Sequence, residues 1–194
     1  YVTKYYTGPG ESPIVAIAKA SQTGAGTNLI SGISLGMEST FVSVIIVAAT
    51  IFAGYLFLGF YGIALAGMGM LATTGIIMSL DTFGPIADNA QGMVEMAHLG
   101  GKAPQVTASL DAVGNTTKAL TKGFAVGSAA VAASSLFATY FEATNLAYID
   151  IATPKVFIGL LIGAALPFLF SSRLIGSVGR AAFEVVEEVR RQFR

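Results

Sequence analysis

Four polar side chains with a helical spacing stand just before a long apolar stretch: Asp111, Asn115, Lys118 and Lys122. If this segment is helical, they fall at i, i+4, i+7 and i+11, so they share one face of the helix. Carboxylate and amide oxygens without His or Cys suit a hard cation such as Mg²⁺, which commonly bridges to a phosphate. Two lysines beside such a site suit a polyanionic substrate. Alternatively, the ammonium group of a lysine replaces a monovalent cation.

A second group of polar residues lies earlier in the chain, where an acidic residue recurs every seven positions: Asp81, Asp88 and Glu95. They share one side of a helix if that helix continues past Pro85, a residue expected to kink or end it. The sequence therefore predicts that carboxylates from one helix lie near the Asn and Lys side chains of the next. Ionisable groups at membrane depth are costly and usually functional, an argument that applies best to Asp81 and then to Asp88.

A purely structural interpretation of the helix that carries Asp111, Lys118 and Lys122 stays open at this point. In that interpretation Asp111 is a helix N-cap, and Lys118 and Lys122 extend their ammonium groups to lipid headgroups. The spacing of the residues does not separate the two interpretations.

The composition indicates a polytopic membrane protein. The 194 residues are 54% hydrophobic and 11% charged, with a mean hydropathy of +0.70, whereas soluble domains carry about 25% charged residues. Basic and acidic residues number 11 each, so no basic surface for nucleic acid is expected. The chain has no cysteine, which excludes disulfides and thiolate chemistry, and its single histidine, His98, argues against a multi-histidine zinc site.

Four segments are long and apolar enough to cross about 30 Å of hydrocarbon, and each must be helical there. No formal charge occurs from Ser39 to Leu80, which allows two crossings joined by a tight turn at "GFYG". Pro167 should kink or end the last crossing. Residues 13–37 are expected to form a helix that leads into the first. The sequence thus predicts an all-α, multi-pass membrane protein with about four transmembrane helices, at 39–59, 62–81, 123–141 and 156–172.

The cations gather on one side of this topology. Five lysines precede the first crossing or lie between the second and third, and Arg173, Arg180, Arg190, Arg191 and Arg194 follow the fourth. Lys155, between the third and fourth crossings, is the one cation on the other side. The positive-inside rule therefore puts residues 1–38, 89–122 and 173–194 in the cytoplasm. Small residues in "GFAVG" and "GLLIG" further predict close packing between helices.

Several long motifs closely resemble the membrane-bound, ion-pumping pyrophosphatases: "DTFGPIADNAQGMVEMA", "LDAVGNTTKALTKGFAVGSAA", "TPKVFIGLLIGAALPFLFSS" and "VGRAAFEVVEEVRRQF". The similarity extends over essentially all of the chain. It implies an internal segment, 1–194, of a bundle of about sixteen transmembrane helices that works as a homodimer in a lipid bilayer. Such a protein hydrolyses pyrophosphate with Mg²⁺ on the cytoplasmic side and pumps H⁺ or Na⁺ outward.

The resemblance also implies roles for individual residues. Asp88, the Asp of "GPIADNA", and Asn115, the Asn of "GNTT", belong to the hydrolytic centre that binds Mg²⁺ and pyrophosphate. Potassium-dependent members have Ala at the position of Lys118 and usually a small residue such as Gly at Thr121. The ammonium of Lys118 thus takes the place of K⁺ beside the pyrophosphate, which implies potassium independence and favours H⁺ as the transported ion. Lys122 lines the same site.

Other motifs of this family lie outside the chain, including most metal ligands, the carboxylates that activate the attacking water and the ion gate. We therefore expect the segment alone neither to hydrolyse pyrophosphate nor to pump. Asp81 either belongs to the path that couples the site to the gate or pairs with a lysine on a helix outside the segment. The alternatives are a Na⁺ pump of the same family, a secondary transporter with Asp81 and Asp88 at a coupling-ion site, and a structural membrane subunit.

Overall fold

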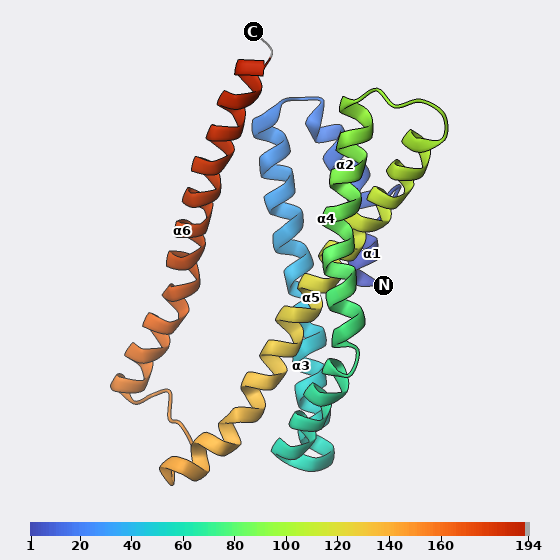
Figure 1. Cartoon of the computed structure of the whole chain (residues 1–194). Coiled ribbons are helices and arrows are strands. Elements are labelled where there is room, and N and C mark those ends of the chain that lie inside the picture. The colour runs from blue at the N-terminus through green and yellow to red at the C-terminus, as the bar shows by residue number, and fades with distance from the viewer. Residues whose placement is uncertain (193–194) are drawn as a thin grey trace. The chain divides into compact units, whose positions relative to one another are not determined.

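The computed structural model of the protein describes residues 1–192, and all of their regular secondary structure is helical. This confirms the predicted all-α class. Phe193 and Arg194, the last two positions of the predicted cytoplasmic segment 173–194, lie outside the described residues. The helices are α1 (Val2–Thr7), α2 (Ser12–Ser21), α3 (Ala25–Leu71), α4 (Thr74–Met96), α5 (Ala103–Thr144) and α6 (Pro154–Gln192) (Figure 1).

The chain divides into two compact units. The first, Tyr1–Tyr140, holds α1 to α4 and nearly all of α5, and the second begins at Phe141 and holds α6. All the polar residues singled out at positions 81–122 therefore belong to the first unit.

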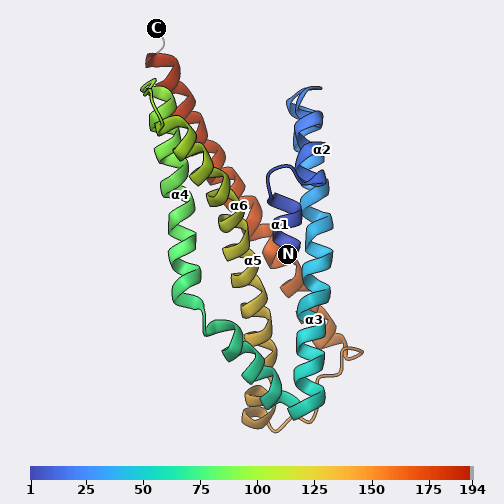
Figure 2. The same ribbon diagram turned by 90° about the vertical axis from the view of Figure 1, so that its right-hand side faces the viewer.

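α3 consists of two helical limbs joined by a sharp reversal at Leu58 and Gly59, where the backbone is not helical. Gly59 has a φ of 61°, in the left-handed region that glycine enters without a Cβ clash. Beyond the reversal the two limbs are in contact, because a Cβ on Gly54 would lie 3.0 Å from the carbonyl carbon of Gly62. Figure 2 shows the second limb leaving the lower end of α3 and leading into α4. The reversal lies at the start of the predicted "GFYG" turn.

Within residues 1–192, three helices are long and apolar enough to cross a membrane: α3, α5 and α6. The sequence predicted about four crossings. The numbers differ because the second predicted crossing, 62–81, is divided between the second limb of α3 and the start of α4, with a break at Ala72 and Thr73. The limits of the crossings and the sidedness of the segments between them stay predictions.

The structure bears on two further expectations about helix ends. Of the two outcomes expected at Pro85 and Pro167, a kink or an end, the end does not occur, because α4 and α6 continue through these residues. Since proline has no N–H, the backbone carbonyl of Asp81 loses the helical hydrogen bond that residue 85 would otherwise donate. The single helix expected over residues 13–37 is interrupted between α2 and α3, where Gly24 has a φ of 126°.

The core of the first unit lies where both limbs of α3 pack on α5. Val131 of α5 is completely buried, and a Cβ on Gly67 would lie 3.5 Å from it. A Cβ on Gly127 would lie 3.5 Å from Met70 and 3.6 Å from Val47, so the predicted close packing at "GFAVG" is confirmed at this glycine. In "GLLIG" of α6, no described atom approaches either glycine within 4 Å of a Cβ position.

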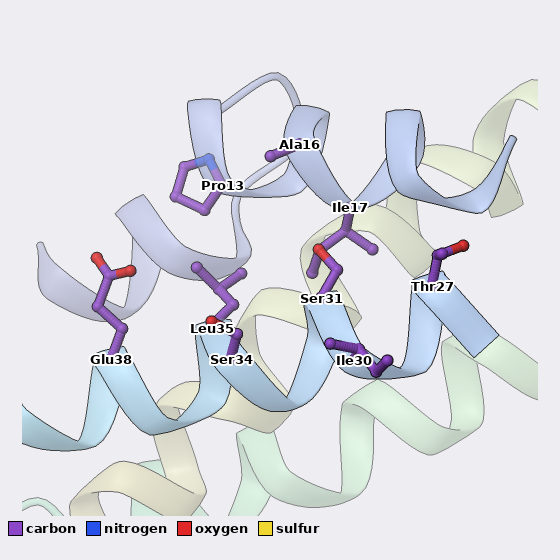
Figure 3. A pocket seen from close by; sticks show the side chains of 9 residues that line it. All are labelled: Pro13, Ala16, Ile17, Thr27, Ile30, Ser31, Ser34, Leu35 and Glu38. Carbon is purple, nitrogen blue, oxygen red and sulfur yellow. The ribbon is translucent and has the colours of Figure 1, made fainter. Parts of the chain in front are cut away.

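The two short N-terminal helices pack on the first limb of α3. Tyr6 of α1 is buried and donates a hydrogen bond of 3.0 Å to Glu38 Oε1. A groove of about 380 Å³ lies between α2 and α3, where Pro13 and Ile17 face Leu35 (Figure 3). Its lining is mainly apolar, and it takes in none of the polar residues at positions 81–122.

Candidate functional site

Helices α4 and α5 approach each other closely at a pair of glycines. A Cβ on Gly84 would lie only 2.8 Å from the carbonyl oxygen of Gly114. A Cβ on Gly114 would lie 3.1 Å from Gly84 Cα and 3.5 Å from Ala87 Cβ. Small residues at a helix contact allow the two backbones to come this close. This contact sets which polar side chains of α4 meet those of α5.

The Lys118 ammonium is held between two oxygen acceptors, one from each helix. Its Nζ donates to Asp88 Oδ2 at 2.6 Å and to Asn115 Oδ1 at 3.2 Å. The first contact has the short length of a charge-assisted hydrogen bond. The Lys118 side chain is 23% exposed, whereas that of Asp88 is 61% exposed. The carboxylate therefore remains accessible to a further ligand although it is paired.

The polar contacts continue along α5 to Asp111. Asn115 Nδ2 donates to Asp111 Oδ2 at 3.1 Å. The other oxygen, Asp111 Oδ1, is buried and has no hydrogen-bond partner among the described residues. Because α5 begins at Ala103, Asp111 lies within the helix, so its interpretation as an N-cap is wrong. A buried carboxylate oxygen without a donor is costly, which makes it a natural acceptor for a group from elsewhere in the protein.

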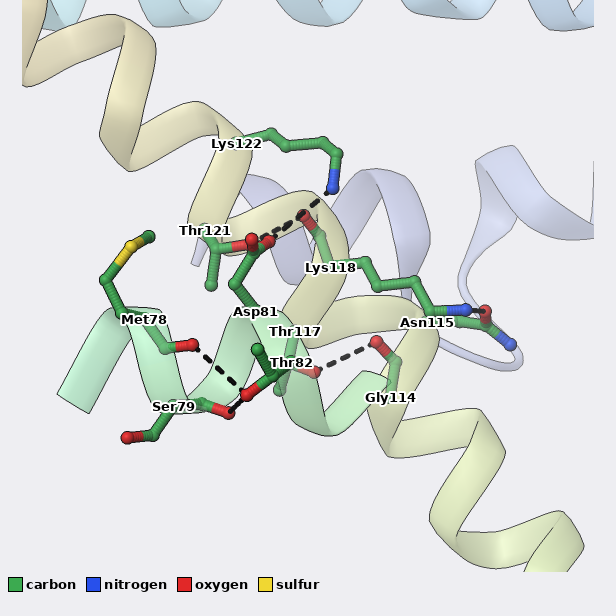
Figure 4. A network of polar contacts seen from close by, with 10 residues as sticks. All are labelled: Met78, Ser79, Asp81, Thr82, Gly114, Asn115, Thr117, Lys118, Thr121 and Lys122. Atoms are coloured by element: carbon green, nitrogen blue, oxygen red, sulfur yellow. Dashed lines mark hydrogen bonds and ion pairs between the residues drawn. The ribbon is translucent and has the colours of Figure 1, made fainter. Parts of the chain in front are cut away.

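A second polar contact between the helices surrounds Asp81 (Figure 4). The buried Thr121 donates its hydroxyl to Asp81 Oδ1 at 2.7 Å, and Lys122 Nζ lies 3.6 Å from the same oxygen. Thr121 Oγ1 also lies 3.0 Å from the backbone carbonyl of Lys118, an alternative acceptor for its single proton. Asp81 is thus paired with a lysine within this chain.

All the predicted site residues come from the α4–α5 pair. Asp88, Asn115 and Lys118 form one contact group, and Asp81, Thr121 and Lys122 form the other. Lysines 118 and 122 are therefore paired with carboxylates, and they do not only extend toward headgroups as the structural interpretation required. Glu95, the third member of the seven-residue series, accepts instead from Gln91 of its own helix at 2.7 Å.

Sequence reasoning missed the two glycines and one polar contact. The hydroxyl of Thr107 donates to Gln91 Oε1, which joins α5 to α4 beyond the Gly84–Gly114 contact. The sequence did contain a signal for these glycines, because Gly84 lies between Asp81 and Asp88 and Gly114 lies between Asp111 and Lys118. Their pairing could not be read from the motifs, because two isolated glycines do not indicate which of them meet.

The oxygen donors fit part of a Mg²⁺ site. Among residues 1–192, no group of three or more His, Asp or Glu side chains lies close enough together to hold a metal. However, Mg²⁺ is usually bound by one or two carboxylates together with water and substrate phosphate oxygens. The exposed carboxylate of Asp88 and the amide oxygen of Asn115 suit that pattern, and the unpartnered Asp111 Oδ1 adds a hard donor nearby.

Comparison with known sequences identifies the family. Residues 1–194 match the family described as inorganic H⁺ pyrophosphatase. The chain belongs to this family. It is 50% identical to a K⁺-insensitive pyrophosphate-energized proton pump of Methanosarcina mazei, and 47% identical to a protein of the same description from Chloroflexus aurantiacus. It is 46% identical to a putative K⁺-stimulated pyrophosphate-energized sodium pump of Clostridium tetani.

Each of these alignments includes the whole chain but only part of the relative. The chain spans 30% of the Methanosarcina protein, 28% of the Chloroflexus protein and 30% of the Clostridium protein. With the apolar helices α3, α5 and α6, membership of the H⁺ pyrophosphatase family makes this chain part of an integral membrane protein.

Proposed function

We propose that the protein hydrolyses inorganic pyrophosphate and couples the hydrolysis to H⁺ pumping across its membrane without a requirement for K⁺. The family assignment supports pyrophosphate as the substrate and is consistent with H⁺ as the ion. The observation that carries the potassium independence is the Lys118 ammonium, fixed 2.6 Å from Asp88 and 3.2 Å from Asn115. This segment supplies part of the site and is inactive alone.

In this proposal Asp88 and Asn115 hold Mg²⁺ together with the pyrophosphate, and the metal offsets the charge of the phosphate oxygens when it is bound. Lys118 places a permanent positive charge beside them. An ammonium has three donor protons, and two of those on Lys118 are directed to Asp88 and Asn115. The third is available for an oxygen of the substrate. A tethered cation in this position makes a dissolved K⁺ unnecessary.

Lys122 has a different part in the same site. Its side chain is 73% exposed and lies 3.6 Å from Asp81 Oδ1, so it is less constrained than Lys118. It can turn toward a polyanion at the mouth of the helix pair. Thr121 holds Asp81 through its hydroxyl, and Asp81 belongs to the path between hydrolysis and ion transfer.

The runner-up is a Na⁺ pump. The Clostridium relative is described as a putative sodium pump, and its identity of 46% differs little from the 50% of the Methanosarcina proton pump. Overall identity therefore does not decide the ion, and the argument for H⁺ depends on Lys118. A secondary transporter and a structural subunit are disfavoured by the family assignment.

Two features of the assembly complete the proposal. The cytoplasmic side holds residues 1–38, 89–122 and 173–194, as the distribution of Lys and Arg supports. The full-length protein is a homodimer, as the resemblance to the ion-pumping pyrophosphatases implies. The polar group around Asp88 and Lys118 then faces the cytoplasmic pool of pyrophosphate.

The test uses the full-length protein in inverted membrane vesicles. Mg²⁺-dependent pyrophosphate hydrolysis and acidification of the vesicle lumen are followed with and without K⁺ and Na⁺. We expect the wild type to be indifferent to K⁺, and Lys118→Ala to lose at least about tenfold of its rate without K⁺ and recover much of it with K⁺. The control is Lys102→Ala, an exposed lysine in the turn before α5.

Three outcomes would change the proposal. A Lys118→Ala variant that keeps the full rate without K⁺ would remove the role of the ammonium. Hydrolysis that requires Na⁺ in the wild type would replace H⁺ by Na⁺ as the transported ion. Absence of Mg²⁺-dependent hydrolysis in the full-length protein would remove the pyrophosphatase function itself.

A further inference from the structure

The stem of Lys118 crosses the backbone of α4 at Gly84. A Cβ on Gly84 would lie 2.5 Å from Lys118 Cγ and 2.9 Å from Lys118 Cε. Both distances are shorter than any ordinary contact of a Cβ atom. The lysine side chain therefore occupies the space that a side chain at position 84 would need.

We propose that Gly84 is a positioning residue that directs the Lys118 ammonium to its place between Asp88 and Asn115. A lysine has a long, flexible stem, so its charge has no fixed position without such a constraint. Asp88 lies one helical turn after Gly84 on α4, and Asn115 lies one turn before Lys118 on α5. The bare backbone at Gly84 provides the path along which the stem reaches both acceptors. This inference rests on the proposed function, because it specifies how the cation that replaces K⁺ is held.

A methyl group at position 84 would have two separable effects. It would displace the Lys118 stem, and it would also push against the Gly114 carbonyl oxygen, 2.8 Å from the Cβ position, and so separate the helices. Gly114 offers a matched control for the second effect. A Cβ there would lie 3.1 Å and 3.3 Å from Gly84 backbone atoms and 3.5 Å from Ala87 Cβ, and its three nearest contacts include no atom of Lys118.

The experiment compares Gly84→Ala, Gly114→Ala, Lys118→Ala and the double variant Gly84→Ala/Lys118→Ala in the full-length protein. Pyrophosphate hydrolysis with Mg²⁺ is measured over a range of K⁺ concentrations. We expect Gly84→Ala to lose at least about tenfold of its K⁺-free rate and to gain K⁺ stimulation, because the displaced ammonium leaves the cation position empty. Gly114→Ala also separates the helices but leaves the lysine stem its path, so any K⁺ stimulation that it gains should be smaller than that of Gly84→Ala. The double variant should share the K⁺ activation curve of Lys118→Ala.

A Gly84→Ala variant with wild-type indifference to K⁺, or with the same K⁺ response as Gly114→Ala, would overturn the inference. If Gly84→Ala does not accumulate but the double variant does, the clash with the lysine stem is confirmed. If neither accumulates, Gly84 serves helix packing alone and the inference is wrong.

Failure of the proposed function is distinguishable from failure of this inference. If Lys118→Ala stays indifferent to K⁺, the cation-replacement role has failed, and the hydrolysis rates alone decide the role of Gly84. An effect of Gly84→Ala that is at least about tenfold larger in the wild-type background than in the Lys118→Ala background shows coupling between the two positions. Equal effects in both backgrounds would show that no positioning occurs.

Discussion

Replacement of Asp88 by Asn separates a role in folding from a role at the reaction centre. In the unsubstituted protein, Lys118 Nζ lies 2.6 Å from the Asp88 carboxylate. Asp88→Asn removes the negative charge but keeps an oxygen that can accept a hydrogen bond from this ammonium. With the two side chains 23% and 61% exposed, the pair is partly hydrated. Ion pairs exposed to solvent contribute roughly 0.2–1 kcal/mol to stability. The substitution should therefore destabilise the protein by about 1 kcal/mol at most.

The expected effect on hydrolysis is larger. If Asp88 helps to hold Mg²⁺ and pyrophosphate, loss of its charge removes electrostatic stabilisation of a kind that is worth about 100-fold or more in rate. That factor corresponds to about 2.7 kcal/mol of activation free energy, clearly above the cost to folding. The two values differ enough for one variant to decide between a structural ion pair and a site residue.

The assay measures hydrolysis at saturating Mg²⁺ and pyrophosphate, with thermal unfolding of the same purified full-length protein. The matched control is Asp150→Asn in the loop between α5 and α6, where the carboxylate accepts a local hydrogen bond of 2.9 Å from the Ala152 N–H. We expect a shift of the unfolding temperature of at most a few degrees in both variants, and a loss of rate in Asp88→Asn only. A rate within about fivefold of wild type, equivalent to about 1 kcal/mol, would refute the reasoning.

Two further variants test the second polar contact and the helical reversal. Thr121→Val keeps the shape of the buried side chain but removes the donor to Asp81, so we expect hydrolysis within about fivefold of wild type and less acidification per pyrophosphate hydrolysed. An unchanged ratio of acidification to hydrolysis would show that Asp81 takes no part in coupling. Gly59→Ala meets no atom within 4 Å but must adopt a φ of 61° with a ψ of −145°, a backbone conformation open essentially only to glycine, so it should cost about 1–3 kcal/mol of stability. Its K⁺ response should equal that of wild type, and thermal unfolding with a K⁺ titration checks both.

The sequence predicted the helices and the polar faces of the site because both depend on local spacing. The i, i+4, i+7 pattern from Asp111 to Lys118 placed these residues on one face of α5, and the structure joins them through Asn115. The seven-residue series on α4 likewise placed Asp81 and Asp88 on one side, toward α5.

The register between α4 and α5 could not be predicted, because periodicity specifies a face of a helix but not its partner's position along the axis. That position depends on the contact of Gly84 with Gly114, which is a property of two surfaces together. The division of the second predicted crossing between α3 and α4 could not be predicted either. The apolar run contains no charge to show where a helix breaks, and Thr73, the N-cap residue of α4, makes no side-chain capping hydrogen bond that would mark the start of a new helix.

The register also explains why Thr121 is the residue through which the two polar groups can affect each other. Asp81 and Asp88 are seven residues apart on α4, a separation of about 10 Å along the helix axis. Thr121 has one proton and two acceptors, Asp81 Oδ1 at 2.7 Å and the backbone carbonyl of Lys118 at 3.0 Å. A change in the charge of Asp81 alters the preference of that proton for the carboxylate, since hydrogen bonds to ionised acceptors are the stronger ones. The Lys118 carbonyl then gains or loses a donor. A shift of α5 by one turn would break this connection, so the Gly84–Gly114 contact that places Lys118 beside Asp88 also keeps Thr121 beside Asp81.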